Sequence, residues 1–197
     1  MHTITAPSQP RARGEAQVTA KSRDGTSVIA TLRQAGSSKL VFPRGGAGLQ
    51  AVLVNTAGGV TGGDRFALSA TARPGTQLTL TTQAAERAYG AQPGETGRVT
   101  NRLCVAEGAQ LNWLPQETIL FENSSVRRDM KVDLHDTARF LFAESLVLGR
   151  VAMGETLHNA HFHDQVEIRR GGTLVFADAL ALCGDISAHM ARCAGGA

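Results

Sequence analysis

Cysteine and aromatic residues are scarce in this chain, and their scarcity argues against several kinds of protein. The 197 residues include only three cysteines, an odd number without C-x-x-C spacing, which disfavours a disulfide framework and a cysteine-based zinc site. We expect Cys104, which lies in an apolar run, to be a small buried hydrophobic residue. Aromatic residues make up 5% of the sequence, so aliphatic and alanine side chains must form most of the core.

Long apolar runs are also missing, and the positive charge is small. The first 17 residues are polar and lack the apolar centre of a signal peptide, and no later stretch is long enough to span a membrane. The net charge is +3 and the basic residues are scattered, without a basic run interleaved with aromatic residues, which argues against a nucleic-acid partner. These features predict a protein of the reducing cytoplasm, with a flexible segment over residues 1–17 and a single β-rich domain over residues 18–197.

Two glycine pairs, Gly58-Gly59 and Gly62-Gly63, mark the most informative stretch of the chain. Apolar residues before the pairs predict a short strand, and alternating residues after Asp64 predict another. A phosphate-binding glycine loop leads into a helix, whose N-terminus holds the phosphate, so this loop is not expected to bind a nucleotide. Asp64 is either a turn residue within a tight β-connection or a functional carboxylate.

Short alternating or apolar runs recur along the chain with turn residues between them, which is typical of strands. These runs cover residues 27–32, 39–42, 51–54, 65–70, 77–82, 98–105, 110–114, 117–121, 130–134, 162–168 and 173–182. Helices are expected only at residues 83–89 and 186–193, and no repeat of fixed period is visible. The sequence therefore predicts a mainly β fold, in which many short strands form a β-helix-like stack or an open sandwich with one or two short helices.

Several carboxylates lie next to apolar segments of the sequence. Glu144 and Glu155 bracket an apolar stretch that two glycines interrupt, and Glu117 shares a strand face with Ile119 and Phe121, which predicts an inward orientation. Buried acids are costly unless they are paired or used. The alternative for Glu144 and Glu155 is that they stand at the exposed ends of a strand.

The histidines suggest a second kind of chemistry. His161, His163 and Glu167 follow the spacing His-x-His-x-x-x-Glu, which looks like the first metal-binding motif of the cupin barrels. Two imidazoles and a carboxylate on one strand face can ligate iron, manganese or nickel. The second cupin motif is missing. The alternation of these residues also fits an ordinary strand whose solvent-exposed face carries the histidines. A small cupin-like metal-dependent enzyme using these three residues is therefore the alternative function.

Five stretches in a consistent order resemble the UreD (also called UreH) urease accessory proteins. They read Asn-Thr-Ala-Gly-Gly-Val-Thr-Gly-Gly-Asp (55–64), Thr-Thr-Gln-Ala-Ala-Glu-Arg-Ala-Tyr (81–89), Leu-Pro-Gln-Glu-Thr-Ile-Leu-Phe (114–121), Glu-Ser-Leu-Val-Leu-Gly-Arg-Val-Ala-Met-Gly-Glu (144–155) and Asp-Ala-Leu-Ala-Leu-Cys-Gly-Asp (178–185). The resemblance runs from about residue 27 onward. Compared with the family, the chain looks short at its C-terminus, and we expect such a chain to have an exposed strand edge, poor solubility and impaired complex formation.

The resemblance implies a scaffold without catalytic activity. Members of the family join UreF and the GTPase UreG and dock them onto the urease apoprotein, so that nickel can be inserted into urease. The family likeness implies no tightly bound cofactor, but it implies transient nickel, which an internal channel would conduct. Asp64, Glu144 and Glu155 lie in the matching stretches, and they are the residues expected to line such a nickel path or to be critical for the scaffold.

Overall fold

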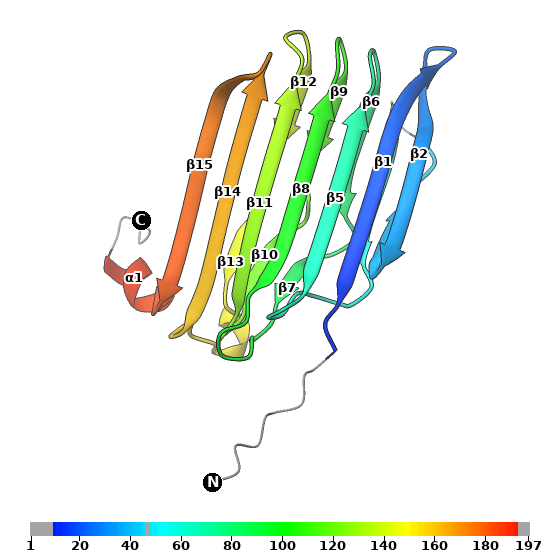
Figure 1. Cartoon of the computed structure of the whole chain (residues 1–197). Coiled ribbons are helices and arrows are strands. Elements are labelled where there is room, and N and C mark those ends of the chain that lie inside the picture. The colour runs from blue at the N-terminus through cyan, green and yellow to red at the C-terminus, as the bar shows by residue number, and fades with distance from the viewer. Residues whose placement is uncertain (1–9, 46–47, 193–197) are drawn as a thin grey trace.

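The computed structural model describes residues 10–45 and 48–192, which form a β-solenoid of about 4 turns (Figure 1). Strands make up 61% of the described residues, and the one α-helix among them is short. The mainly β prediction is therefore confirmed, and of the two predicted arrangements the structure has the β-helix-like stack. No helix in the described residues is long and apolar enough to cross a membrane.

The strands form three sheets, which we name A, B and C. Sheet A contains, in spatial order, β15 (Thr173–Gly184), β14 (Ala160–Arg170), β11 (Ser125–Leu134), β8 (Gly97–Val105), β5 (Arg65–Ala72), β1 (Arg13–Arg23) and β2 (Thr26–Gly36). Sheet B contains β12 (Arg139–Phe142), β9 (Gln110–Trp113), β6 (Gln77–Thr82), β4 (Leu49–Asn55) and β3 (Ser38–Val41). Sheet C contains β13 (Leu146–Leu148), β10 (Thr118–Leu120) and β7 (Glu86–Ala88), and two short helices, η1 (Val151–Met153) and α1 (Ile186–Arg192), complete the fold.

Each central turn of the solenoid contributes one strand to every sheet. The turns β5-β6-β7, β8-β9-β10 and β11-β12-β13 follow one another along the chain, and equivalent strands of successive turns pair in parallel. A side chain that points outward in one turn therefore lies directly beside its equivalent in the next turn. This parallel register decides which residues from distant parts of the sequence become neighbours.

Two hydrophobic clusters fill the interior. Cluster 1 lies between sheets A and B, and Trp113 and Leu111 are among its buried residues. Cluster 2 lies between sheets A and C, and it contains the fully buried Phe162 and Leu120. Strand alternation supplies these residues, and each large side chain contributes about 1.5–3 kcal/mol through burial.

The helix predicted at residues 83–89 is wrong, because this segment contains strand β7. The Glu86 N–H donates to the Glu117 carbonyl at 2.8 Å, and the Tyr89 N–H donates to the Val60 carbonyl at 2.8 Å. These long-range bonds join the segment to neighbouring strands and override its local helical tendency. The helix predicted at residues 186–193 is confirmed as α1, although Cys193 lies outside the described residues.

Three further expectations differ from the structure. Strand β1 begins at Arg13, so residues 13–17 of the segment expected to be flexible are paired in sheet A, whereas residues 1–9 lie outside the described part. Cys104 is exposed, because alternation along β8 turns its neighbours Leu103 and Val105 inward. In β10 the buried residues are Thr118 and Leu120, so the inward face is the one next to the face that carries Glu117. The inward orientation predicted for Glu117 is therefore wrong.

Sheet A ends at β15, whose side chains are nearly all exposed. Leu174, Val175, Phe176 and Leu180 are 40–55% exposed, and Asp178 is the only charged residue of the strand. Phe176 approaches Phe142 of β12, with 6.0 Å between the ring centroids. The exposed strand edge that we expect is therefore present at β15. Unpaired apolar edges of this kind favour association with other chains. Poor solubility stays a prediction.

Candidate functional site

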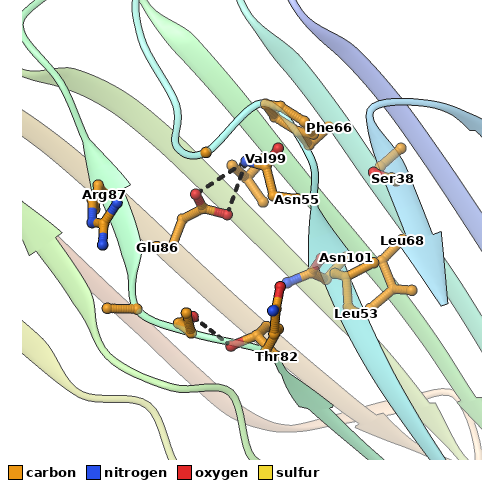
Figure 2. Close-up of a pocket in the computed structure, with 15 residues that line it drawn as sticks. Ser38, Leu53, Asn55, Phe66, Leu68, Thr82, Glu86, Arg87, Val99 and Asn101 are labelled. Atoms are coloured by element: carbon orange, nitrogen blue, oxygen red, sulfur yellow. Dashed lines mark hydrogen bonds between the residues drawn. The ribbon is translucent and has the colours of Figure 1, made fainter. Parts of the chain in front are cut away.

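Two adjoining cavities lie inside the solenoid, between sheet A and the two smaller sheets. The larger has a volume of about 230 Å³ and is drawn in Figure 2, and the smaller has about 60 Å³. Both are lined by Leu53, Thr82, Glu86, Val99 and Asn101, so the two cavities share a wall. These residues come from β4, β6, β7 and β8, which the parallel stacking brings together.

Glu86 is the ionisable residue of this shared wall. Burial raises the pKa of its carboxyl, and a hydrogen bond from the Asn55 side chain partly offsets the rise. The Asn55 amide donates to both oxygens of Glu86, at 3.1 and 3.3 Å, as the dashed lines in Figure 2 show. Within the described residues Glu86 has no cationic partner. A buried carboxylate with a single amide donor can accept a cation at low energetic cost.

Arg128 organises the wall of the smaller cavity. Its guanidinium forms a two-point interaction with the Asp164 carboxylate, and it contacts Glu144 at 2.8 Å between Nη2 and Oε2. The Trp113 indole donates to the other oxygen of Glu144 at 2.8 Å. Burial disfavours the charge of Arg128, but the Asp164 hydrogen bond and the charges of Glu144 and Asp164 outweigh it, so the pKa of Arg128 is raised. The three side chains are only 11–14% exposed.

Asp64 closes the loop that carries the glycine pairs. Its side chain is buried, and its two oxygens accept hydrogen bonds from the Ala12 N–H at 2.7 Å and the Thr61 N–H at 2.9 Å. Gly63 next to it has a φ of 81°, a backbone conformation that favours glycine. The carboxylate thus joins the entry of β1 to the loop before β5, and these contacts favour the structural one of the two roles left open by the sequence.

Glu155 stabilises the segment around η1. Both of its oxygens receive hydrogen bonds from the Arg150 guanidinium, at 2.9 and 3.0 Å, and the Glu122 and Arg150 backbone N–H groups also donate to it. The hydrogen bonds from Arg150 are the main cause of a lowered pKa, which falls to about 2 for Glu155. Arg150 also lies over the Phe121 ring, 4.3 Å from its centroid.

We expect Glu155→Gln to remove part of the acid sensitivity of the fold. The folded-state pKa of Glu155 is about 2 and its unfolded value is 4.5, so its contribution is present above about pH 4.5 and is lost as the pH falls towards 2. Because Arg150 is 49% exposed, that contribution is at most about 1 kcal/mol rather than the full linkage value. Urea unfolding at pH 7 and pH 3 checks this: the gap between wild type and variant should shrink at pH 3, and a constant gap would contradict it.

The histidine strand does not form the predicted cupin site. His161, His163 and Glu167 share the outer face of β14, but Glu167 interacts with Gln165, Lys131 and Arg169. Among residues 10–45 and 48–192, no group of three or more His, Cys, Asp or Glu side chains could hold a metal ion. The fold is also an open solenoid and not a cupin barrel. The alternative of a cupin-like enzyme is therefore wrong.

The three acids singled out in the sequence contact separate protein groups and do not converge. Glu144 lines the smaller cavity, whereas Asp64 and Glu155 are absent from the described linings of both cavities. Sequence reasoning missed Glu86, because it placed this residue on an expected helix. It also missed Arg128, which it did not single out. The 81–89 stretch carries one acid, Glu86, next to one base, Arg87, so its charge gave no signal for a buried acid.

The family model and the similar proteins found by comparison all point to the same family. Residues 12–197 match the family described as UreD urease accessory protein. The chain is 55% identical to a urease accessory protein UreD of Ruegeria sp. (strain TM1040), over 96% of this chain and 64% of that relative. It is 54% identical to UreD of Ruegeria pomeroyi, over 89% of this chain and 69% of the relative, and 49% identical to UreD of Roseobacter denitrificans, over 98% and 70%. The chain thus spans about two thirds of the length of these curated relatives, and it belongs to the UreD family of urease accessory proteins.

Proposed function

We propose that this chain is a scaffold without catalytic activity, which recruits UreF and the GTPase UreG to the urease apoprotein for assembly of the nickel centre. The observation that carries the proposal is the family match over residues 12–197. The exposed, unpaired thiols of Cys104 and Cys183 suit the reducing cytoplasm in which we place this function.

We also infer that nickel, as cargo, passes along the two adjoining cavities. Glu86 supplies carboxylate oxygens there, and Asn101 adds a buried amide. Glu144 also lines the smaller cavity, but Arg128 and Trp113 bind its two oxygens, so Glu86 is the residue that we expect to meet the cation. A single carboxylate holds a divalent cation weakly. Weak binding allows nickel to move along the cavities and to be released, whereas storage would need tight binding. Asp64 and Glu155, the other residues expected on a nickel path, are bound by backbone and arginine donors. Their contacts favour a role in maintaining the scaffold.

Co-expression with UreF, UreG and the urease subunits tests both parts of the proposal. Wild-type chain should co-purify with UreF and raise urease activity in nickel-containing medium. Glu86→Gln keeps the size and the Asn55 contact of the side chain but removes its charge. It should still capture UreF, while the nickel content of urease and its activity fall severalfold because the cation loses its ligand.

Glu107→Gln is the matched control, because Glu107 is an exposed turn residue that lies outside both cavities. Its urease activation should equal that of wild type. Failure of the wild-type chain to capture UreF or to activate urease would end the scaffold proposal. Equal nickel content with Glu86→Gln and wild type would end the cavity route alone.

A further inference from the structure

A row of basic residues crosses the outer face of sheet A at one register. Arg13 of β1 pairs with Arg65 of β5, Arg65 pairs with Arg98 of β8, and Arg98 pairs with Arg127 of β11. His163 of β14 continues the row beyond Arg127. Neighbouring strands lie about 4.8 Å apart, so the four arginines, which we call the arginine row, span about 14 Å.

Most of the positive charge in this row lacks a partner. Arg127 pairs with Asp129 at 3.1 Å, but the guanidinium groups of Arg13, Arg65 and Arg98 form no ion pair with a described residue. In the adjacent row, Ala67 and Thr100 separate Glu15 from Asp129, and Glu15 pairs with Arg33. Like charges directly opposite one another on neighbouring strands are destabilising. The fold therefore maintains a repulsive arrangement that a partner of opposite charge would relieve.

The row also borders a shallow groove. A recess of about 500 Å³ is lined by Arg13, Arg65 and Arg98, with the small side chains of Ala67 and Thr100 beside them. Its one acidic residue, Glu15, is paired with Arg33. Those small residues leave room above the arginines for a bound chain. The one aromatic residue of the lining, Phe66, packs against cluster 2 in the interior. The groove thus combines charge and space but offers no outward ring on which a nucleobase could stack.

We propose that the arginine row is the docking surface for an extended acidic segment of a protein partner, which lies across the strands of sheet A. Carboxylates on every second residue of an extended chain are about 7 Å apart, so two or three of them can reach all four arginines. Arginine and carboxylate groups form strong, directional hydrogen bonds. This inference rests on the proposed function, since a scaffold needs a surface for each protein that it joins, and it names the chemistry of one such partner.

The test uses a fluorescein-labelled peptide of alternating glutamate and glycine as the probe, with the whole chain at low salt. Wild-type chain should bind the peptide, and affinity should fall as salt is added. The double variant Arg65→Ala/Arg98→Ala should bind about tenfold more weakly, because two exposed charge contacts are lost. Its melting temperature should not fall, since these guanidinium groups have no ion pair to lose.

Arg102→Ala is the matched control, because Arg102 is an exposed arginine on the same strand and outer face, two positions beyond Thr100. It should bind the peptide like wild type. An equal loss with Arg102→Ala would show nonspecific attraction and overturn the proposal. Three results with the wild-type chain would also overturn the proposal. The chain could fail to bind the peptide, or bind an oligonucleotide of equal charge more tightly. It could also release the peptide when inorganic phosphate is added at millimolar concentration.

A second arm separates this inference from the proposed function. Purified UreF, UreG and urease apoprotein are each offered to the wild-type chain and to the double variant. Loss of one of these partners from the variant alone supports the docking surface. Equal capture by both chains overturns the docking surface and leaves the scaffold function intact. Capture of none by wild type ends the scaffold function, while the peptide experiment still decides whether the arginine row binds an acidic chain.

Discussion

Arg128→Met should lower the free energy of unfolding by about 3–5 kcal/mol, the cost of leaving buried carboxylates without their cation. The variant keeps most of the volume of the side chain but removes the cation that Glu144 and Asp164 share. Their two negative charges then stay without a partner, although the side chains are only 11% and 14% exposed. The hydrogen bond from Arg128 to the Thr118 hydroxyl is lost as well. Urea unfolding followed by Trp113 fluorescence measures the change, since the indole donates to Glu144.

Neutralising the two acids should restore most of this loss. The triple variant Arg128→Met/Glu144→Gln/Asp164→Asn removes every charge of the network, and replacing a whole buried ion-pair network is often neutral. Glu144→Gln alone should cost less than Arg128→Met, because Arg128 keeps Asp164 and Trp113 keeps an acceptor. If Arg128→Met unfolds at the urea concentration of wild type, the network does not stabilise the fold. If the triple variant is as unstable as the single one, shape and not charge explains the loss.

Local pattern was enough to predict most strands but not their stacking. The alternation of Met130, Val132 and Leu134 predicted β11, and that of Phe162, Val166 and Ile168 predicted β14; all six residues are buried. The choice between a stack and a sandwich depends on which strand pairs with which, and that is a property of the whole fold. Successive turns are unequal in length, so no sequence period revealed the solenoid.

The two features of greatest functional interest arise from the same parallel register. Arg13, Arg65, Arg98 and Arg127 are scattered in the sequence, so the sequence did not reveal them as a group. Pairing of β1, β5, β8 and β11 places them side by side. Glu86 likewise enters the cavity wall because β7 pairs with β10. Local propensity cannot detect either arrangement, since each depends on contacts between different turns of the solenoid.

Asp64→Ala should lower the free energy of unfolding by about 3–5 kcal/mol, because two part-buried backbone N–H groups lose a charged acceptor. Ala12 and Thr61 donate these hydrogen bonds, and the Asp64 side chain is buried. The loss of stability should be greatest near the loop. Amide hydrogen exchange at Thr61 should therefore accelerate more than exchange in the core strands. Urea unfolding and exchange measured on the same samples test both expectations.

Asp64→Asn provides the control, since its amide retains one acceptor oxygen but turns an NH₂ group towards the other backbone donor. It should lose about half as much stability as Asp64→Ala, because one hydrogen bond survives. The two roles left open by the sequence predict different outcomes here. If Asp64 is structural, urease activation by the two variants should fall in proportion to their stability. If both variants unfold like wild type and still fail to activate urease, the carboxylate acts on the cargo or on a partner, and the structural role assigned to it is wrong.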